Sequence, residues 1–277
     1  MHLSAGATAG LLVAALAAGM LDAVAGGSGL IAVPALLAAG LPPHLALGTN
    51  KAQGVFGTCA STLRYARAGL LDGKRARVTF PAGFAGSLCG AALVLLVPPA
   101  TLRPVVMALL VGAALALALR PAVRGGTAAA SKGSSLSTPD ASSNPSARRS
   151  TSGSFAMAAA VALLLGAYDG FFGPGVGTFI IAAFAGLLHR PLARATADAK
   201  VLNFASNFAA LVMFASRGAV LWAVALPMAA TQILGGFFGA HLAVRRGEGL
   251  IRAVVLVVVA ALVLWLLKDM SGARWMP

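Results

Sequence analysis

Long apolar runs separated by short polar connections dominate the chain. Clear examples are residues 3–21, 80–97, 102–119 and 253–267. Each is close to the ~20 residues that a helix needs to cross a hydrocarbon layer of about 30 Å. The alternation of apolar and polar positions that membrane β-strands would show is absent. Because a segment in lipid must satisfy its own backbone hydrogen bonds, the pattern predicts membrane-spanning helices.

The apolar segments fall into two series of five, in the same order. The first series covers 3–21, 28–40, 44–66, 76–97 and 102–120, and the second covers 154–168, 175–188, 194–215, 219–243 and 250–268. Between them, residues 121–153 consist mainly of Ser, Ala, Gly, Thr and Pro, which is typical of a disordered linker. We therefore expect two transmembrane repeats, residues 1–120 and 154–277, joined by a disordered cytoplasmic linker.

Matching motifs indicate that the two series arose by duplication. Asp22 and Asp169 each precede a glycine-rich turn, and a lysine lies early in the third segment of each series. A glycine follows each lysine at the same spacing, from 51 to 69 and from 200 to 218. Shared order with shared spacing is not expected by chance, even in a chain with 33 glycines. Internal repeats of this kind are frequent in secondary transporters.

The composition and charge of the chain also indicate a membrane protein. The chain is 59% hydrophobic and 10% charged, with a mean hydropathy of +0.88, far from the balance of a soluble domain. A net charge of +14 would suggest nucleic-acid binding in a soluble protein. Here the basic residues lie in the connections, as expected for loops that face the cytoplasm. We therefore expect a lipid bilayer as partner and no nucleic acid.

The basic residues also predict the orientation of the repeats. In the first series they gather between the third and fourth segments, at Arg64, Arg67, Lys74, Arg75 and Arg77. In the second they flank the corresponding connection, at Arg190, Arg194, Arg245, Arg246 and Arg252. If basic loops stay inside, the repeats are inverted and each crosses the membrane an odd number of times. Five spans, or three spans plus a re-entrant pair, both satisfy this condition.

The glycine-rich turns are the first candidate binding elements. The residues concerned are Gly26, Gly27, Ser28 and Gly29 in the first repeat, and Gly173, Gly175 and Gly177 in the second. Free N–H groups and the positive dipole end at a helix start favour an anion. The alternative interpretation is a tight turn or a close crossing of two helices.

Two acidic residues lie at the ends of apolar segments, where charge is costly. Asp22 and Asp169 are candidates for proton-carrying carboxylates, or for counter-ions of Lys51 and Lys200 respectively. The alternative is that they cap helices at the membrane surface. A third acidic residue, Asp198, is expected to be a local partner or helix cap.

Polar residues early in the third segments complete the candidate site. They are Thr49, Asn50, Lys51 and Gln53 in the first repeat and Lys200, Asn203 and Asn207 in the second. At helical spacing they can line a path, where a lysine attracts an oxyanion and amides donate further hydrogen bonds. The alternative is a lysine that extends to the lipid headgroups.

Other chemistry finds little support. Cys59 and Cys89 lie in apolar segments without metal-ligand spacing, and we expect them to be small buried residues. The histidines at 44, 189 and 241 form no metal-binding motif, and no nucleotide-binding or hydrolase motif is present. We therefore predict no metal site, no cofactor and no enzymatic activity.

Three short runs resemble a known family. Residues 22–34 (DAVAGGSGLIAVP), 41–44 (LPPH) and 48–51 (GTNK) are similar to the TauE/SafE family, also called the sulfite exporter or TSUP family. The resemblance covers both repeats and omits the linker. It implies a permease of the bacterial cytoplasmic membrane, in a family linked to sulfite, sulfoacetate and other small sulfur-containing or organic anions. The second repeat departs from the pattern, with Pro174 in its turn and Asp198-Ala-Lys200 in place of Thr-Asn-Lys.

We predict an all-α, multi-pass transporter of the bacterial inner membrane with inverted repeats and short helices at the glycine-rich turns. Its substrate is expected to be a small anion such as sulfite, an organosulfonate or a small organic acid, coupled to protons through an aspartate. A channel-like anion pore and a membrane scaffold without transport remain alternatives. A homo-oligomer is compatible with the sequence.

Overall fold

In the computed structural model, residues 4–118 and 145–246 are described, and within these ranges the chain forms nine α-helices and no strand. The helices of the first half are α1 (Ala5–Ala25), α2 (Ser28–Ala38), α3 (Pro43–Arg67), α4 (Gly73–Leu95) and α5 (Pro99–Ala118). Those of the second half are α6 (Pro145–Phe171), α7 (Val176–Gly186), α8 (Leu192–Ser216) and α9 (Trp222–Arg246). The predicted segment 250–268 lies outside the described residues.

Four of these helices, α1, α4, α8 and α9, are long and apolar enough to cross a membrane. α3 is as long as α8, at 25 residues, but it is more polar because it carries the run Thr49 to Gln53. Polar and charged side chains that face lipid are costly. This run is buried inside the protein, so its side chains do not face lipid. The predicted all-α polytopic membrane fold is confirmed.

The predicted linker was too long. Residues 121–144 lie outside the described part, but α6 begins at Pro145, so residues 145–153 are helical rather than disordered. Proline is well suited to the first position of a helix, and a helix that already exists extends at little cost. Composition alone did not show that this polar stretch continues an apolar helix.

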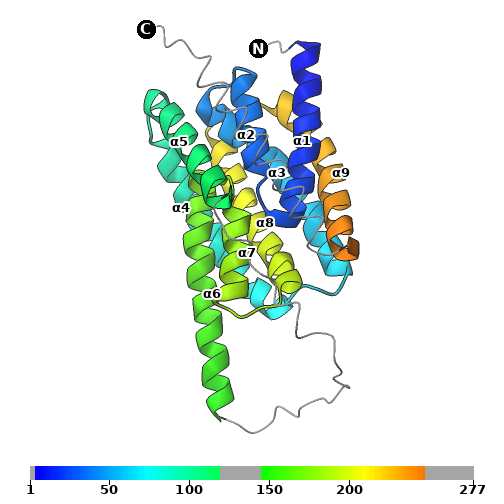
Figure 1. Cartoon of the computed structure of the whole chain (residues 1–277). Coiled ribbons are helices and arrows are strands. Elements are labelled where there is room, and N and C mark those ends of the chain that lie inside the picture. The colour runs from blue at the N-terminus through cyan, green and yellow to red at the C-terminus, as the bar shows by residue number, and fades with distance from the viewer. Residues whose placement is uncertain (1–3, 119–144, 247–277) are drawn as a thin grey trace.

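Short helices follow both glycine-rich turns, as predicted. α2 and α7 each have 11 residues, or about 17 Å of helix, which is too short to cross the bilayer. Each packs against the helix before it, α2 on α1 and α7 on α6, to form a hairpin. Figure 1 shows the α1–α2 hairpin towards one end of the molecule and the α6–α7 hairpin towards the other.

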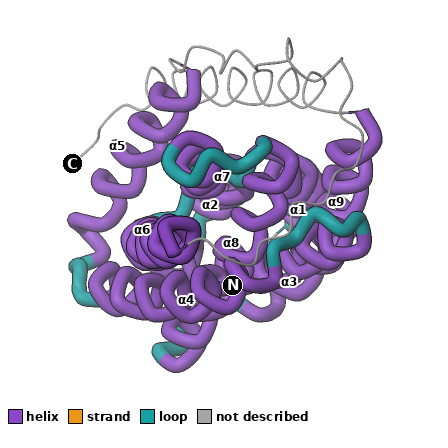
Figure 2. The backbone as a smooth tube through the Cα atoms, turned by 90° about the horizontal axis from the view of Figure 1, so that it is seen from below, coloured by secondary structure: helices purple, strands orange, loops and turns teal. Residues whose placement is uncertain are grey.

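The halves are joined by reciprocal helix packing. α4 packs against α6 and α8, α9 packs against α1 and α3, and α3 contacts α8 in the middle. Figure 2 shows the α4–α6 and α1–α9 pairs on opposite sides of the bundle. The fourth helix of each half therefore lies against the first helix of the other half.

Glycines make these crossings close. A side chain at Gly86 or Gly90 of α4 would collide with the backbone of α6, and one at Gly235 or Gly239 would collide with the backbone of α1. Small residues let membrane helices gain packing contacts that the hydrophobic effect cannot supply in lipid. The matched glycines of the two repeats therefore hold the two halves together.

Cys59 and Cys89 contradict the sequence-based expectation, because both are free and exposed on the outer surface of the protein. In a membrane the outer surface is apolar as well, so hydrophobicity does not separate inward from outward positions.

Replacing Gly90 with valine is expected to destabilise the fold, because the new side chain would press on the Ala167 carbonyl of α6. Overpacking of this kind costs about 1–3 kcal/mol or more. The matched control is Gly112→Val in α5, where no atom lies within 4 Å of an added Cβ. Thermal melting of the detergent-solubilised protein checks this, and equal melting temperatures for the two variants would contradict the assigned contact.

Candidate functional site

The two glycine-rich turns touch each other inside the bundle. Gly26 has a left-handed φ of +68°, and a side chain there would collide with the backbone of Gly177. The Thr178 hydroxyl donates to the carbonyl of Ala25 at 2.8 Å and ties the turns together. Glycine is required at this contact for both its conformation and its size. The N-terminal ends of α2 and α7 are thereby brought to one place.

A small polar cavity lies at this place. It is lined by Asp22, Gly27, Ser28, Gly29, Asn50, Lys51, Asp169, Gly173, Val176, Gly177, Asn203 and Asn207. The space open to the centre of a water molecule is about 10 Å³, which holds about one water. The residues that line it come from both halves, and the cavity has no room for anything larger than a water.

Two ion pairs cross between the halves beside this cavity. Lys51 Nζ lies 2.6 Å from Asp169 Oδ1, and Lys200 Nζ lies 3.2 Å from Asp22 Oδ2. All four side chains are buried, and Lys51 and Lys200 are among the largest fully buried side chains of the described part. Neither lysine extends to the headgroups and neither aspartate caps a helix at the membrane surface, so both of those alternatives are wrong.

The predicted partners were also wrong. The sequence paired Asp22 with Lys51 and Asp169 with Lys200, within each half, whereas the structure pairs them across the halves. The reason is that α3 and α8 pack against each other between the halves, so that the lysine of each reaches the aspartate of the other half. Both lysines follow their aspartates at similar spacing, so the sequence pattern could not distinguish the two pairings.

Each carboxylate has additional donors. The Ser206 hydroxyl donates to Asp169 Oδ2, and the Gly27 N–H donates to Asp22 Oδ1 at 3.2 Å. Lys200 also donates to the backbone carbonyl of Asp22. A buried charge pair is stable only when such bonds satisfy its remaining lone pairs and protons.

The two lysines are not equivalent towards the cavity. Lys51 lines it, together with the amide side chains of Asn50, Asn203 and Asn207, while Lys200 does not. The Asn203 Oδ1 atom is buried and has no hydrogen-bond partner among the described residues. The arrangement can hold a small group by one ammonium, several amides and the starts of two helices.

Five predicted site residues lie outside the cavity lining, namely Gly26, Thr49, Gln53, Gly175 and Lys200. The Thr49 hydroxyl accepts from the N–H of Leu221, and the Gln53 amide donates to Asn50 at 3.4 Å. Gly175 has a left-handed φ and precedes α7. These residues bind or adjoin residues of the cavity lining, but they do not line the cavity themselves.

The structure adds residues that the sequence did not single out. Val176 lines the cavity and Ser206 binds Asp169. Ser206 lies six residues after Lys200, between two asparagines of the same helix, and this polar spacing could have indicated it.

A cluster of four charged residues joins the α3–α4 and α7–α8 connections at one end of the bundle. Its members are Asp72, Arg75, Arg190 and Asp198. Asp198, expected to be a local partner or helix cap, pairs with Arg190.

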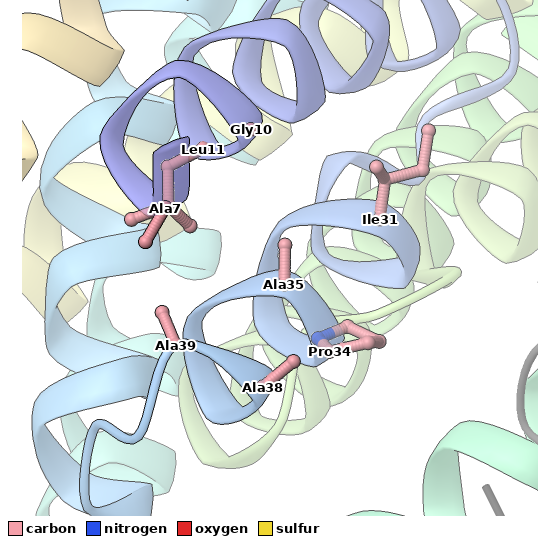
Figure 3. A pocket seen from close by; sticks show the side chains of 8 residues that line it. All are labelled: Ala7, Gly10, Leu11, Ile31, Pro34, Ala35, Ala38 and Ala39. Atoms are coloured by element: carbon pink, nitrogen blue, oxygen red, sulfur yellow. The ribbon is translucent and has the colours of Figure 1, made fainter. Parts of the chain in front are cut away.

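A larger hollow of about 430 Å³ lies between α1 and α2 (Figure 3). It is lined by small and apolar residues, including Ala7, Leu11, Ile31 and Pro34. No charged or hydrogen-bonding side chain lines it, so it offers no group that would hold an anion. The small polar cavity is therefore the candidate site.

Comparison with known proteins identifies the family. The model of the sulfite exporter TauE/SafE family matches residues 11–266, which is nearly the whole chain and includes every residue of the cavity. The chain belongs to the TauE/SafE family. The resemblance of the short motifs is thereby confirmed, and the family is one of membrane transporters.

TauE/SafE relatives are similar over almost their full length. A probable membrane transporter protein, ORF9 of Sinorhizobium sp., is 38% identical over 94% of this chain and 92% of its own. The probable membrane transporter protein YfcA of Escherichia coli K12 is 35% identical over 95% of this chain and 90% of its own. A probable membrane transporter protein of Haemophilus influenzae is 34% identical over 87% and 86%. No solved structure matches the chain.

A double-mutant cycle tests the crossed pairs. Lys51→Met leaves Asp169 buried without its cation, which is expected to cost about 3–5 kcal/mol of stability. Adding Asp169→Asn should recover most of that loss, because no uncompensated charge remains. Melting temperature in detergent is the measurement.

The matched control for this cycle is Lys51→Met combined with Asp22→Asn. It changes the same residue types but breaks both crossed pairs, so the losses should add. Recovery by Asp22→Asn instead of Asp169→Asn would mean that the pairs lie within each half.

Proposed function

We propose that this protein is a secondary transporter that moves a small anion across the bacterial inner membrane by alternating access of two inverted halves. The observation that carries the proposal is the polar cavity at which two helix starts and one lysine converge. Helix N-termini that end near the middle of a membrane protein and face an anionic group are a recurring form of transporter binding site. Membership of a transporter family supports the same function.

The donors favour an anion with compact oxygen atoms. Lys51 supplies the positive charge, the amides of Asn50, Asn203 and Asn207 can donate hydrogen bonds, and the starts of α2 and α7 add N–H groups. Sulfite, a small organosulfonate and a small carboxylate all present two or more such oxygens. The name of the family, sulfite exporter, supports the sulfur oxyanions within this class.

Proton coupling follows from the ion pair at the cavity. An anion that binds Lys51 competes with Asp169, which lies 2.6 Å from the same ammonium. A carboxylate that loses its cation inside the protein takes up a proton, because burial disfavours its charged form. Binding one monovalent anion with one proton leaves the net charge of the site unchanged. Transport of one such anion with one proton is then electroneutral.

A closed cavity favours alternating access over a continuous pore. With room for about one water, it admits no anion of the proposed class until one side opens. An anion channel would need a path that is wide enough along its whole length in its conducting state.

The inverted arrangement is supported by the two ends of the bundle. The α3–α4 connection of the first half contacts the α7–α8 connection of the second through Asp72 and Arg190. The same end carries Arg67, Lys74, Arg77 and Arg194, and we assign it to the cytoplasm. Among the described residues, the opposite end, where Leu221 meets Thr49, carries Arg217 in the α8–α9 connection and His44 and Arg103 near the starts of α3 and α5.

Reporter fusions test this topology. A reporter at residue 70 is expected to be cytoplasmic and one at residue 218 periplasmic, because these equivalent connections lie at opposite ends of the bundle. Placement of both reporters on the same side of the membrane would contradict the inverted arrangement.

Counterflow in liposomes against a panel of sulfite, organosulfonates and small carboxylates tests transport. Replacing Lys51 with alanine should weaken substrate binding about 10- to 100-fold, as expected for loss of one charge-assisted contact. The matched control is Lys74→Ala, which removes an exposed lysine at the end of the bundle. Saturable uptake that is unchanged in the Lys51→Ala variant would contradict the proposed anion transport through this site.

The alternative functions give different results in the same assay. Flux without saturation would indicate an anion pore. A purified protein that moves no anion on the panel and co-purifies with one partner would indicate a scaffold.

Coupling is tested by separating exchange from net transport. Asp169→Asn should retain anion counterflow but lose accumulation driven by a pH gradient, since exchange needs no net proton movement. The comparison variant is Asp22→Asn, which also lines the cavity but pairs with Lys200 instead of Lys51, and which should keep its proton-driven uptake if Asp169 carries the proton. Full proton-driven accumulation in Asp169→Asn would assign the coupling elsewhere.

A further inference from the structure

Two equivalent hydrogen bonds join the halves at opposite ends of the bundle. The N–H of Asp72 donates to Asp198 Oδ1 at 3.1 Å, and the N–H of Leu221 donates to the Thr49 hydroxyl at 3.1 Å. Positions 72 and 221, and positions 49 and 198, are each separated by 149 residues, as are Lys51 and Lys200. Each bond links the connection after the third helix of one half to the third helix of the other half.

At the basic end this hydrogen bond belongs to an ionic cluster, defined as Asp72, Arg75, Arg190 and Asp198. One guanidinium nitrogen of Arg190 lies 3.1 Å from Asp72 Oδ2 and 3.3 Å from Asp198 Oδ2. Arg75 Nε lies 3.9 Å from the same oxygen of Asp72. Asp198 and Arg75 are only 3% and 7% exposed, whereas the side chains of Arg190 and Asp72 are 17% and 26% exposed, so the cluster lies between the buried interior and the end of the bundle.

At the other end the same four positions form an apolar cluster, defined as Leu41, Thr49, Leu221 and Val224. Leu41 corresponds to Arg190, Leu221 to Asp72 and Val224 to Arg75, each at a separation of 149 residues. Leu41 is 3% exposed, and Leu221 and Val224 pack against the core that contains it. Equivalent positions thus make the contact between the halves at both ends, with opposite chemistry.

We propose that these two clusters are the two gates of the transport path, an ionic gate towards the cytoplasm and an apolar gate towards the periplasm. This inference rests on the proposed transport function and assigns the residues that open and close the site. If the halves move relative to each other around the cavity, the contacts at the two ends must break in turn. The two clusters are the symmetry-related contacts that such a movement separates.

The different chemistry of the gates has an energetic consequence. Opening the apolar gate exposes apolar surface to water, which is unfavourable in proportion to the area exposed. Opening the ionic gate separates paired charges but restores their hydration, which offsets much of the Coulomb energy that is lost. Removing charge from one gate and apolar surface from the other should therefore open opposite sides of the same cavity.

Access to the cavity can be measured without knowledge of the substrate. The protein is made free of its own thiols by Cys59→Ala and Cys89→Ala, both at exposed positions, and Ser28→Cys then places one thiol in the cavity lining. A membrane-impermeant maleimide is applied to right-side-out and inside-out vesicles. The rate of labelling reports which side of the cavity is open.

Arg190→Gln is expected to raise labelling from the cytoplasmic side about tenfold, and Leu41→Ala to raise it by a similar factor from the periplasmic side. Arg194→Gln is the control for the ionic gate, because it removes an exposed arginine from the first turn of α8, four residues after Arg190. Leu226→Ala is the control for the apolar gate, because Leu226 is 53% exposed on the same helix as Val224. Neither control should change labelling from either side.

Asp72→Asn serves as a second ionic-gate variant should Arg190→Gln fail to fold. Asp72 accepts the backbone N–H groups of Lys74 and Arg75 at the start of α4, and asparagine can keep this cap while the charge is lost. The gate assignment is overturned if folded variants of the two clusters leave labelling unchanged, or raise it from the same side.

The labelling and transport experiments fail independently. Unchanged labelling together with a Lys51-dependent counterflow would reject the gates and retain the transporter. Labelling that follows the expected pattern without counterflow of any anion would retain the moving contacts and reject the proposed substrate class.

Discussion

Two buried ion pairs that cross between the halves are the interaction on which the rest of the structure depends. Lys51 with Asp169 and Lys200 with Asp22 place four charges inside a membrane protein, where each alone would be very costly. The halves must therefore dock with the correct partners or leave charges unpaired. The glycine crossings allow the helices to approach closely enough for both pairs to form. Three of these four side chains, Asp22, Lys51 and Asp169, also line the cavity.

Much of the fold and most of the candidate site residues could be predicted from the sequence. Hydrophobic runs predicted the long helices, and the duplicated Asp, glycine-rich turn and Lys predicted most residues that line the cavity. These features are local, because each depends on residues within one segment. The pairing of Asp22 with Lys200 is not local, since it depends on how helices of different halves pack. Identical motifs in both halves leave that choice open.

The errors at Cys59 and Pro145 have other physical origins. Lipid and protein interior are both apolar, so a cysteine in an apolar segment gives no signal for the direction in which it points. The start of α6 is a polar stretch that a helix can include outside the hydrocarbon layer. The composition of this stretch resembles that of a linker, because the residues that favour helix formation are the apolar ones that follow it. Neither of these two incorrect predictions concerns a residue that lines the cavity.

The reciprocal packing of α4 on α6 and α9 on α1 has a further consequence. The closest backbone contacts are made between helices of different repeats, so each repeat covers part of its surface with helices of the other. A half-length protein would leave its first and fourth helices without these surfaces. A second copy inserted upside down would supply them, with its aspartate beside the lysine of the first. In the inverted topology that we propose, the architecture is that of an antiparallel homodimer whose two subunits have become one polypeptide.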